Sequence, residues 1–199
     1  MTLILASTSP RRRVLLQELG LPFEVVASGV AEPPPAPGAS PASYAQSLSL
    51  AKARAVARLH SGDTVLGADT VVAVDQHILG KPRDPDDALR MLRLLRGRWH
   101  EVITAVAAIC GDDVHQSTGR ASVHMRNSAD AELAAYANSG EPMDKSGSYA
   151  VQGLGGALVD EVRGCFNAVV GLPLCSVADV LQQCGLRPDD VSCCDFKKA

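Results

Sequence analysis

At residues 64–74 the chain reads Thr64-Val65-Leu66-Gly67-Ala68-Asp69-Thr70-Val71-Val72-Ala73-Val74. This apolar run is rich in β-branched residues, which predicts a buried strand interrupted once at Gly67-Ala68. One carboxylate, Asp69, lies inside it. An ionised carboxylate is costly to bury without a metal, a cationic partner or a role in proton transfer. From the run alone, a functional Asp69 and an Asp69 that merely faces solvent at a strand end are both open.

The composition predicts a single α/β domain over residues 1–199, with a short polar tail at 186–199. The chain is 46% hydrophobic and 21% charged, which is typical of soluble globular proteins. Its net charge of −3 disfavours a general affinity for nucleic acid or anionic membranes, so a local cluster of cations must hold any anionic ligand. No apolar run is long enough to span a bilayer and no signal peptide is visible, so we expect a cytoplasmic protein.

The six cysteines show no C-x-x-C pair and no interleaved histidines at zinc spacing. We therefore interpret most of them as buried, reduced thiols rather than metal ligands. Cys193-Cys194 lies in the polar tail, where we expect exposed thiols that oxidise readily. The full set is Cys110, Cys165, Cys175, Cys184, Cys193 and Cys194.

The N-terminal segment has the pattern of an anion-binding turn. A short apolar strand at residues 3–6 leads to Ser7, and Ser9 is then positioned to cap a helix that begins at Pro10. Arg11-Arg12-Arg13 occupies the first helical turn, where the helix dipole disfavours cations. Cations at this place make sense if an anion binds between them and the free backbone N–H groups. Three solvated arginines on an exposed turn are the alternative.

The next segments place further charged residues near the Asp69 run. Residues 31–41 form a proline-rich loop that we expect to carry Glu32 to the rim of a cleft. A helix follows from about Ala42 to His60, and Lys52 lies in it beside the predicted apolar stripe. A lysine on a helix is usually solvated, so this one alone signals little. A hairpin over residues 75–82 places Lys81 just after its second strand. The predicted stripe consists of Tyr44, Leu48, Ala51, Ala55 and Leu59.

In the second half we predict helices at 84–97, 128–140 and 173–184, with Ser128 as a cap, and strands at 98–106, 121–125 and 158–162. The apolar residues of 140–153 repeat with neither the helical nor the strand period, so this segment is predicted to be a loop. A loop of this length is either disordered or functional. Glu141, Asp144 and Lys145 in this loop are candidates to meet a cationic cofactor or a ligand. Gln152 carries an amide able to read the edge of a base.

Several separated segments together resemble the Maf proteins, which are nucleoside triphosphate pyrophosphatases. They follow the order of that family and run from residue 3 to about 182. The segments are Leu5-Ala6-Ser7-Thr8-Ser9-Pro10-Arg11-Arg12, Gly67-Ala68-Asp69-Thr70-Val71-Val72, Gly80-Lys81-Pro82, His100-Glu101-Val102-Ile103-Thr104, Gly140-Glu-Pro-Met-Asp-Lys-Ser-Gly, Tyr149-Ala-Val-Gln152-Gly153 and Asn167-Ala-Val-Val-Gly-Leu-Pro-Leu174.

The resemblance implies an α/β fold in which helices flank a mixed, twisted β-sheet and two lobes surround a deep cleft. It implies a homodimer and a Mg²⁺- or Mn²⁺-dependent hydrolase that cleaves a nucleoside triphosphate between its α- and β-phosphates. Asp69 matches the catalytic carboxylate of the family, and Glu32 is the best candidate to share the metal with it. The residues that would hold the triphosphate are Ser7, Arg11, Arg12, Lys52 and Lys81.

Arg11, Thr70 and Gln152 match the branch of the family that acts on dTTP and UTP. The branch directed at 7-methylated guanine nucleotides has an aromatic residue, Gln and Glu at these three places. A neutral amide suits the imide edge of a pyrimidine, whereas a carboxylate suits a cationic methylated guanine. We therefore predict action on dTTP and UTP, with modified pyrimidine nucleotides as further candidates. Ala31 departs from the family, which often has Asp there.

Two alternatives stay open at this stage. One is a non-catalytic, nucleotide-binding regulator of cell division and septum formation. The other is a pyrophosphatase with a different base preference, such as 7-methyl-GTP. The acidic net charge and the retained Asp69 argue against a nucleic-acid-binding module. We expect a nucleoside triphosphate as partner, and neither stable nucleic acid nor a membrane.

Overall fold

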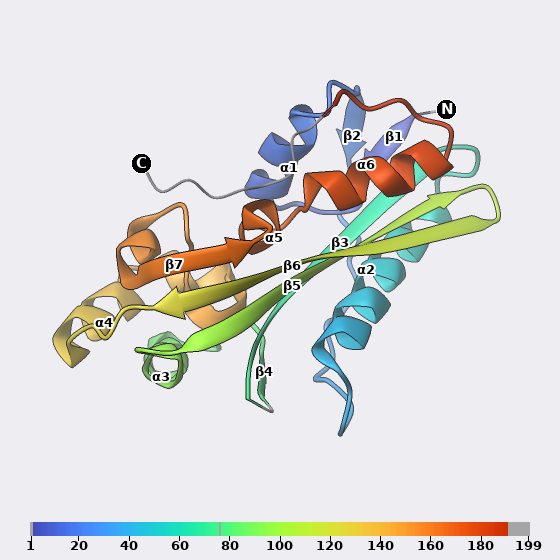
Figure 1. The fold of residues 1–199 in the computed structure, drawn as a ribbon. Helices are drawn as coiled ribbons and strands as arrows, with labels where there is room; N and C mark the ends of the chain where they lie inside the picture. The colour runs from blue at the N-terminus through green and yellow to red at the C-terminus, as the bar shows by residue number, and fades with distance from the viewer. Residues whose placement is uncertain (1, 76, 191–199) are drawn as a thin grey trace.

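The fold is built around one long strand, β3 (Thr64–Val74), as the computed structural model of residues 2–75 and 77–190 shows (Figure 1). Along one edge, β3 pairs antiparallel with β5 over nearly its full length. Along the other edge it pairs in parallel with β1 through Thr64–Leu66, and antiparallel with β4 through Val72–Val74. Among the described residues, no strand pairs with residues 67–71 on this second edge. Asp69 lies in the middle of that opening.

The seven strands form one mixed sheet in the order β2-β1-β3-β5-β6-β7, with β4 beside β3. The other strands are β1 (Leu3–Leu5), β2 (Phe23–Val25), β4 (His77–Leu79), β5 (Trp99–Cys110), β6 (Asp113–Met125) and β7 (Val159–Gly164). The helices are α1 (Pro10–Gln17), α2 (Pro41–Ala57), α3 (Pro85–Leu95), α4 (Asp130–Ala137), α5 (Phe166–Val170) and α6 (Leu174–Gln183). Short 3₁₀ turns cover Glu141–Asp144, Ser146–Ser148 and Leu154–Leu158.

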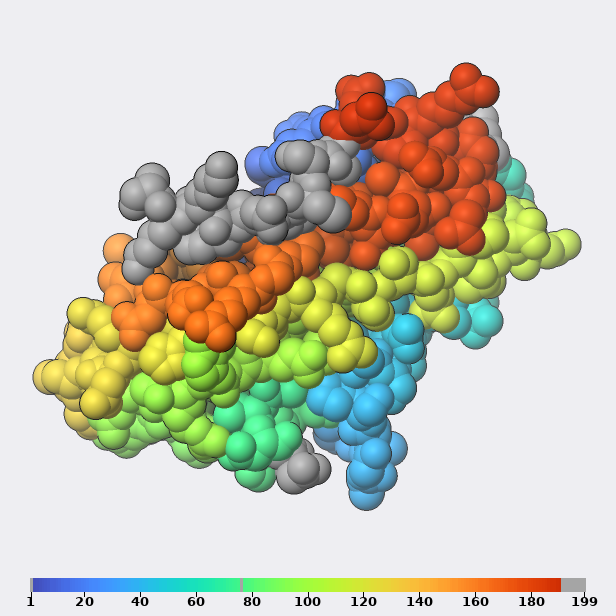
Figure 2. All heavy atoms as spheres, viewed as in Figure 1, coloured from blue at the N-terminus to red at the C-terminus, as the bar shows by residue number. Residues whose placement is uncertain are grey.

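Helices cover both faces of the sheet. In Figure 1, α2 lies on one side of β3 and β5, and α6 with α5 lies on the opposite side. On the face that Figure 2 shows, β6 is yellow-green, α4 is yellow, the region of β7 is orange and α6 is red. Two large apolar cores fill the interior, one between β1, α1 and α6 and the other beneath α3 and α4. Val151 and Phe166 pack against both cores and so join them.

Close contact between α2 and β3 depends on Gly67. A Cβ atom at this position would lie 2.3 Å from the carbonyl oxygen of Ser49 and 2.8 Å from the backbone nitrogen of Ala53. Both atoms belong to the α2 backbone, so a side chain at residue 67 would push the helix away. The sequence predicted an interruption at Gly67-Ala68, but the strand is continuous there. The glycine instead permits the close approach of the helix.

Of the apolar stripe predicted for α2, only Leu48 is buried. Leu59 is 81% exposed and lies beyond the helix, whereas the buried face includes Lys52. The prediction missed the small residues of the buried face: Ala45 and Ala53 pack in cores with strand residues, and Ser49 lies close to Gly67. Small side chains allow the close approach that Gly67 completes on the strand. Lys52 is therefore a buried cation rather than a solvated one.

Three other boundaries differ from the predictions. The β5 and β6 strands both extend further toward the turn that connects them than the predicted ranges do. The outer half of β6 was missed because it has polar side chains on its exposed face. Ala129, not Ser128, is the N-cap of α4, and the buried Ser128 hydroxyl has no hydrogen-bond partner among the described residues.

Within the described residues, no helix is both long and apolar enough to cross a membrane. Residues 191–199 of the predicted tail, with Cys193-Cys194, lie outside the described residues.

Candidate active site

A cavity of about 480 Å³ opens at the unpaired edge of β3. Its walls come from the β1–α1 turn, the loop before α2, one face of α2, β3, and the 143–152 and 169–171 segments. All nine residues that the family resemblance assigned to the site line this one cavity. They are Ser7, Arg11, Arg12, Glu32, Lys52, Asp69, Thr70, Lys81 and Gln152.

Lys52 joins the two predicted carboxylates at the centre of the cavity. Its Nζ atom donates to Asp69 Oδ1 at 2.6 Å and to Glu32 Oε1 at 2.6 Å. Lys81 Nζ contacts the other oxygen of Glu32 at 3.1 Å. The three inner residues come from α2, the preceding loop and β3, so the packing of α2 on the strand fixes their geometry. Lys52 was a weak candidate from the sequence, and the structure makes it the link between both carboxylates.

The two carboxylates differ in their protonation energetics. Burial raises the pKa of Asp69 above its usual range, although the Lys52 ammonium and the Arg12 guanidinium act in the opposite direction. Burial also acts upward on Glu32, but its hydrogen bonds and ion pairs with Lys52 and Lys81 outweigh it and hold the pKa of Glu32 low. Asp69 is therefore the more basic of the two groups. A buried carboxylate with a raised pKa is the better proton acceptor near neutral pH.

Arg12 is tied into the opposite wall by three hydrogen bonds. It donates from Nε to the carbonyl oxygen of Gly171 at 2.8 Å and from Nη2 to the Thr70 hydroxyl at 3.1 Å. A longer contact of 3.4 Å joins Nη1 to the Ser7 hydroxyl. Burial lowers the pKa of Arg12, while the nearby Asp69 charge raises it. Arginine still carries its charge at neutral pH, so this wall presents a fixed cation.

The Thr70 hydroxyl belongs to a directional chain of hydrogen bonds. Thr104 donates to the carbonyl oxygen of Ala168 at 2.7 Å, which leaves its oxygen to accept from Thr70 at 2.8 Å. Thr70 in turn accepts from Arg12. The hydroxyl of Thr70 therefore orients Arg12, and its role as a base-selecting residue stays a prediction. Thr104 was not singled out from the sequence, although it lies in the quoted 100–104 segment.

The first turn of α1 places only part of the arginine run in the cavity. Arg11 and Arg12 line it, whereas Arg13 is exposed and lies outside its lining. Ser9 is the N-cap with Pro10 in the first turn, as predicted, but its side chain makes no capping bond. The backbone N–H of Ser9 donates instead to Ser7 Oγ at 3.3 Å. This turn therefore presents cations and the free backbone donors of a helix start to the same space.

The 140–153 segment contributes to the cavity through its second part. Glu141, a candidate for binding a ligand, instead accepts from the Tyr136 hydroxyl at 2.7 Å and from the backbone N–H groups of Leu154 and Gly155 at 3.0 Å each. That carboxylate stabilises the loop and does not line the cavity. Asp144 and Lys145 do line the cavity and form an ion pair with each other. Gln152 lines the cavity and is exposed, and its amide makes no hydrogen bond within the described residues.

A buried pair, His100 and Tyr149, supports the floor of the cavity and was missed by the sequence reasoning. His100 Nε2 and the Tyr149 hydroxyl are 2.7 Å apart, with the rings edge to face. Burial lowers the pKa of His100 to about 4, so the imidazole is neutral at pH 7. Tyr149 contacts the cavity directly. Both residues lie in the quoted family segments, which was the available signal.

Cysteine chemistry has no part in this cavity. The described cysteines form no disulfide with one another, and none of them lines the cavity. The prediction that most of them are buried was wrong, because only Cys184 among the described cysteines is buried, whereas Cys110, Cys165 and Cys175 are partly exposed. Burial raises the pKa of the Cys184 thiol to about 12, so this sulfur is protonated at neutral pH when no metal is bound.

Comparison with known proteins matches this chain to one family along most of its length. The family model described as "Maf-like protein" matches residues 2–184. A dTTP/UTP pyrophosphatase of Nitratidesulfovibrio vulgaris is 45% identical over 92% of this chain and 87% of its own length. A dTTP/UTP pyrophosphatase of Shewanella sp. MR-7 is 45% identical over 94% of this chain and 100% of its own. The protein of that name from Anaeromyxobacter dehalogenans is 47% identical, covering 92% and 94%.

Among solved structures, a nucleoside-triphosphatase / dITP/XTP pyrophosphatase from Mycobacterium abscessus aligns with 92% of this chain and 97% of its own. The sequence identity is 18% and the TM-score is 0.47.

Proposed function

Because this chain belongs to the Maf-like protein family, we propose that it hydrolyses dTTP and UTP to the nucleoside monophosphate and pyrophosphate. The observation that carries the proposal is the Asp69–Lys52–Glu32 cluster in a cavity whose opposite wall holds Arg12. A basic carboxylate and fixed cations therefore face each other across the same cavity. Relatives named dTTP/UTP pyrophosphatase, at 43–47% identity, support the choice of substrate.

Asp69 accepts the proton of the attacking water in the proposed reaction. Its burial keeps the carboxylate basic, and Lys52 holds Oδ1 in place, which leaves Oδ2 for the water. The water attacks the α-phosphorus, the bond from that phosphorus to the bridging oxygen breaks, and pyrophosphate leaves with the electron pair. Such displacements depend mainly on positioning and on cations that stabilise the spreading negative charge.

The cations of the cavity divide between its two walls. Arg11 and Arg12 project from the first turn of α1, and Lys52 and Lys81 lie beside Glu32. When a triphosphate lies between these walls, the four cations neutralise the negative charges along its phosphate chain. The N–H groups at the start of α1 add donors that match phosphate oxygens. Ser7 belongs to this turn and keeps Arg12 oriented.

The donor set fits a hard divalent cation. Asp69 and Glu32 both direct an oxygen at one cationic centre, Lys52 Nζ, so a shared positive charge suits the pair. Carboxylate oxygens are the ligands that Mg²⁺ and Mn²⁺ prefer, and Asp69 and Glu32 would hold the ion. When bound there, such an ion supplies charge neutralisation on the phosphates and lowers the pKa of a bound water. Ala31, where the family often has Asp, leaves Glu32 as the loop carboxylate in the cavity lining among the described residues.

A panel of triphosphates tests the proposed function. We expect pyrophosphate release from dTTP and UTP with Mg²⁺ or Mn²⁺, and its loss after EDTA treatment. Measuring pyrophosphate and orthophosphate separately identifies the bond that is cleaved. Faster turnover of 7-methyl-GTP would overturn the base preference alone. Nucleotide binding without turnover of any triphosphate would overturn the enzyme and favour the non-catalytic regulator.

Gln152 is proposed to read the base, because it carries an unengaged amide at the cavity surface. Replacing it by Glu places an acceptor-only carboxylate opposite the acceptor oxygens of uracil and thymine. We expect kcat/KM for UTP to fall about 10- to 100-fold, mostly through KM, which is the cost of one mismatched polar contact. The relative rate on 7-methyl-GTP should rise. Gln182→Glu on the exposed side of α6 is the matched control, and an equal effect of both variants would contradict the assignment.

The pH dependence of turnover reports the protonation of Asp69. Burial raises its pKa and the Lys52 cation lowers it, so activity is lost as pH falls through this raised pKa. Removing the cation with Lys52→Met should move the acidic limb of kcat/KM to higher pH and reduce kcat/KM at pH 7 at least about tenfold. Profiles of kcat/KM against pH for both proteins measure the shift. An unmoved acidic limb would show that another group controls it.

Two further expectations belong to this proposal. We propose a homodimer and a cytoplasmic location, as the family resemblance and the composition predicted. Light scattering coupled to gel filtration measures the first, and fractionation of cells that express the chain measures the second.

A further inference from the structure

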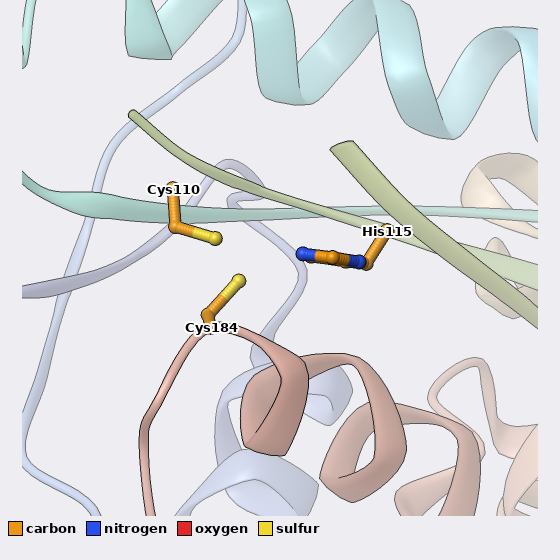
Figure 3. Close-up of side chains that lie close together, drawn as sticks. All are labelled: Cys110, His115 and Cys184. Carbon is orange, nitrogen blue, oxygen red and sulfur yellow. The ribbon is translucent and has the colours of Figure 1, made fainter. Parts of the chain in front are cut away.

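Three side chains far from the catalytic cavity converge at the opposite end of the long strands. They are Cys110 at the end of β5, His115 near the start of β6, and Cys184 at the end of α6. One ligand atom from each lies within 4.8 Å of the other two. Figure 3 shows the two sulfur atoms pointing toward each other and a ring nitrogen of His115 pointing toward both.

From this cluster we propose that the protein binds one zinc ion through Cys110, His115 and Cys184. Two sulfur donors and an imidazole nitrogen form a set that suits zinc and other thiophilic ions rather than Mg²⁺ or Ca²⁺. A fourth tetrahedral position remains for a water or a nearby carboxylate. The proposal concerns a different place and a different metal chemistry from Asp69 and Glu32, and it does not depend on the proposed catalytic function.

The three ligands lie on elements that hold them in place. The β5–β6 turn is tight, with Cys110 paired to Asp113 and Ala108 paired to His115 across the hairpin. Cys184 is the C-cap of α6, and its backbone N–H donates to the carbonyl oxygens of Val180 and Leu181. Because α6 packs on β5 and β6, it brings Cys184 to the hairpin. A site built on such elements needs little rearrangement to bind a metal.

The distances and burial also fit a metal centre. Zinc–sulfur bonds of about 2.3 Å at tetrahedral angles separate two sulfur atoms by about 3.8 Å. The Sγ atoms of Cys110 and Cys184 already lie within 4.8 Å of each other, so small side-chain rotations complete the geometry. Cys184 is buried, whereas Cys110 and His115 are partly exposed and give an ion access from solvent.

A disulfide between the same two cysteines is the competing chemistry. It would join the sulfur atoms, release two protons and pass two electrons to an oxidant such as a peroxide or an oxidised thiol. A disulfide makes no use of His115. The histidine nitrogen directed at both sulfurs therefore favours a metal.

The site would act on stability rather than on turnover. In the β3–β5 register Cys110 lies opposite Thr64 at the start of β3, whereas Asp69 lies opposite Ala105. None of the three ligands lines the catalytic cavity. Zinc here would cross-link the end of α6 to the β5–β6 hairpin, and it would stabilise the folded chain because the unfolded chain lacks the assembled site.

Metal titration of the reduced, metal-stripped full-length protein tests the proposal. The Asp69→Asn background keeps the catalytic carboxylate pair from contributing. We expect one zinc ion per chain in competition with a chromophoric chelator. Cobalt should give the visible bands of a tetrahedral site and near-ultraviolet thiolate charge-transfer absorption. At about 100-fold excess over Kd, zinc should raise Tm by about 5–11 °C.

Variants of the ligands assign the site. Cys110→Ser, Cys184→Ser and His115→Gln should each weaken zinc binding at least about 100-fold and abolish the rise in Tm. Cys175→Ser on the same helix and the double variant Cys193→Ser/Cys194→Ser are the controls that should bind as the parent does. Unchanged affinity in the ligand variants would overturn the proposal, as would loss of binding in the tail variant. Absence of stoichiometric zinc binding, or a cobalt spectrum without thiolate bands, would overturn it even if a variant fails to fold.

Discussion

The Asp69→Asn variant should lose at least about 10³-fold in kcat on UTP while keeping its fold. Asparagine has nearly the same shape, but its amide cannot accept the proton of the attacking water at neutral pH. Lys52 retains its hydrogen bond to Glu32, so the cavity keeps one of its two anchoring contacts. Initial rates of pyrophosphate release at saturating UTP measure the effect.

The controls for this variant separate chemistry from folding and binding. Asp112→Asn removes the same charge from the exposed β5–β6 turn and should leave kcat within about twofold, because surface charges at this distance are screened. The Tm of Asp69→Asn should stay close to that of the parent protein, and UTP should still protect it against heat. Turnover equal to that of the parent would show that Asp69 is not the base.

The Gly67→Ala variant should lose both stability and activity. The new methyl group would lie 2.3 Å from the Ser49 carbonyl oxygen and 2.8 Å from the Ala53 nitrogen, and neither backbone atom can move without α2. Overpacking of this kind costs about 1–3 kcal/mol, or roughly 2–10 °C in Tm for a chain of this size. Ser49 and Ala53 flank Lys52 on the helix, so a shift of α2 also moves Lys52 away from Asp69. A displacement of about 1 Å can reduce turnover about 100-fold.

Gly80→Ala is the matched control for stability. A Cβ atom at Gly80 would meet no atom within 4 Å, so this variant should unfold within about 2 °C of the parent protein. Thermal unfolding of both variants gives the comparison. If Gly67→Ala unfolds at the same temperature as Gly80→Ala, the close contact between α2 and β3 does not limit stability.

The sequence predicted those parts of the fold that local chemistry determines. The β-branched run of β3, the Ser40 cap of α2 and the acidic first turn of α3 each specify an element by neighbouring residues. The outer half of β6 could not be found in this way, because its polar alternation depends on pairing with β5. Ser128 looked like a helix cap, but the chain enters α4 one residue later.

The candidate site was predictable as a set of residues and not as a set of contacts. Family segments located Asp69 and the arginines in the sequence, and the proline-rich loop pointed to Glu32, but neither gave the central position of Lys52. That position follows from small residues on α2 and from Gly67. Gly67 matters because it allows the backbones of α2 and β3 to lie close together. The approach of Cys184 to Cys110 and His115 is likewise invisible in the sequence, because a helix packed late in the chain brings them together.

The parallel pairing of β1 has a consequence for synthesis of the chain. On the ribosome, β1 emerges before α2, yet one of its two partner strands is β3, which follows only after α2. The β5–β6 hairpin, in contrast, closes as soon as its own residues have emerged, since its contacts are local. The nascent chain therefore carries the apolar Leu3–Leu5 segment incompletely paired while α2 is made, which is when chaperones have access to it. Arg12 acquires its contact with Gly171 only after residue 171 has emerged, so this wall of the cavity is assembled later than the β5–β6 hairpin.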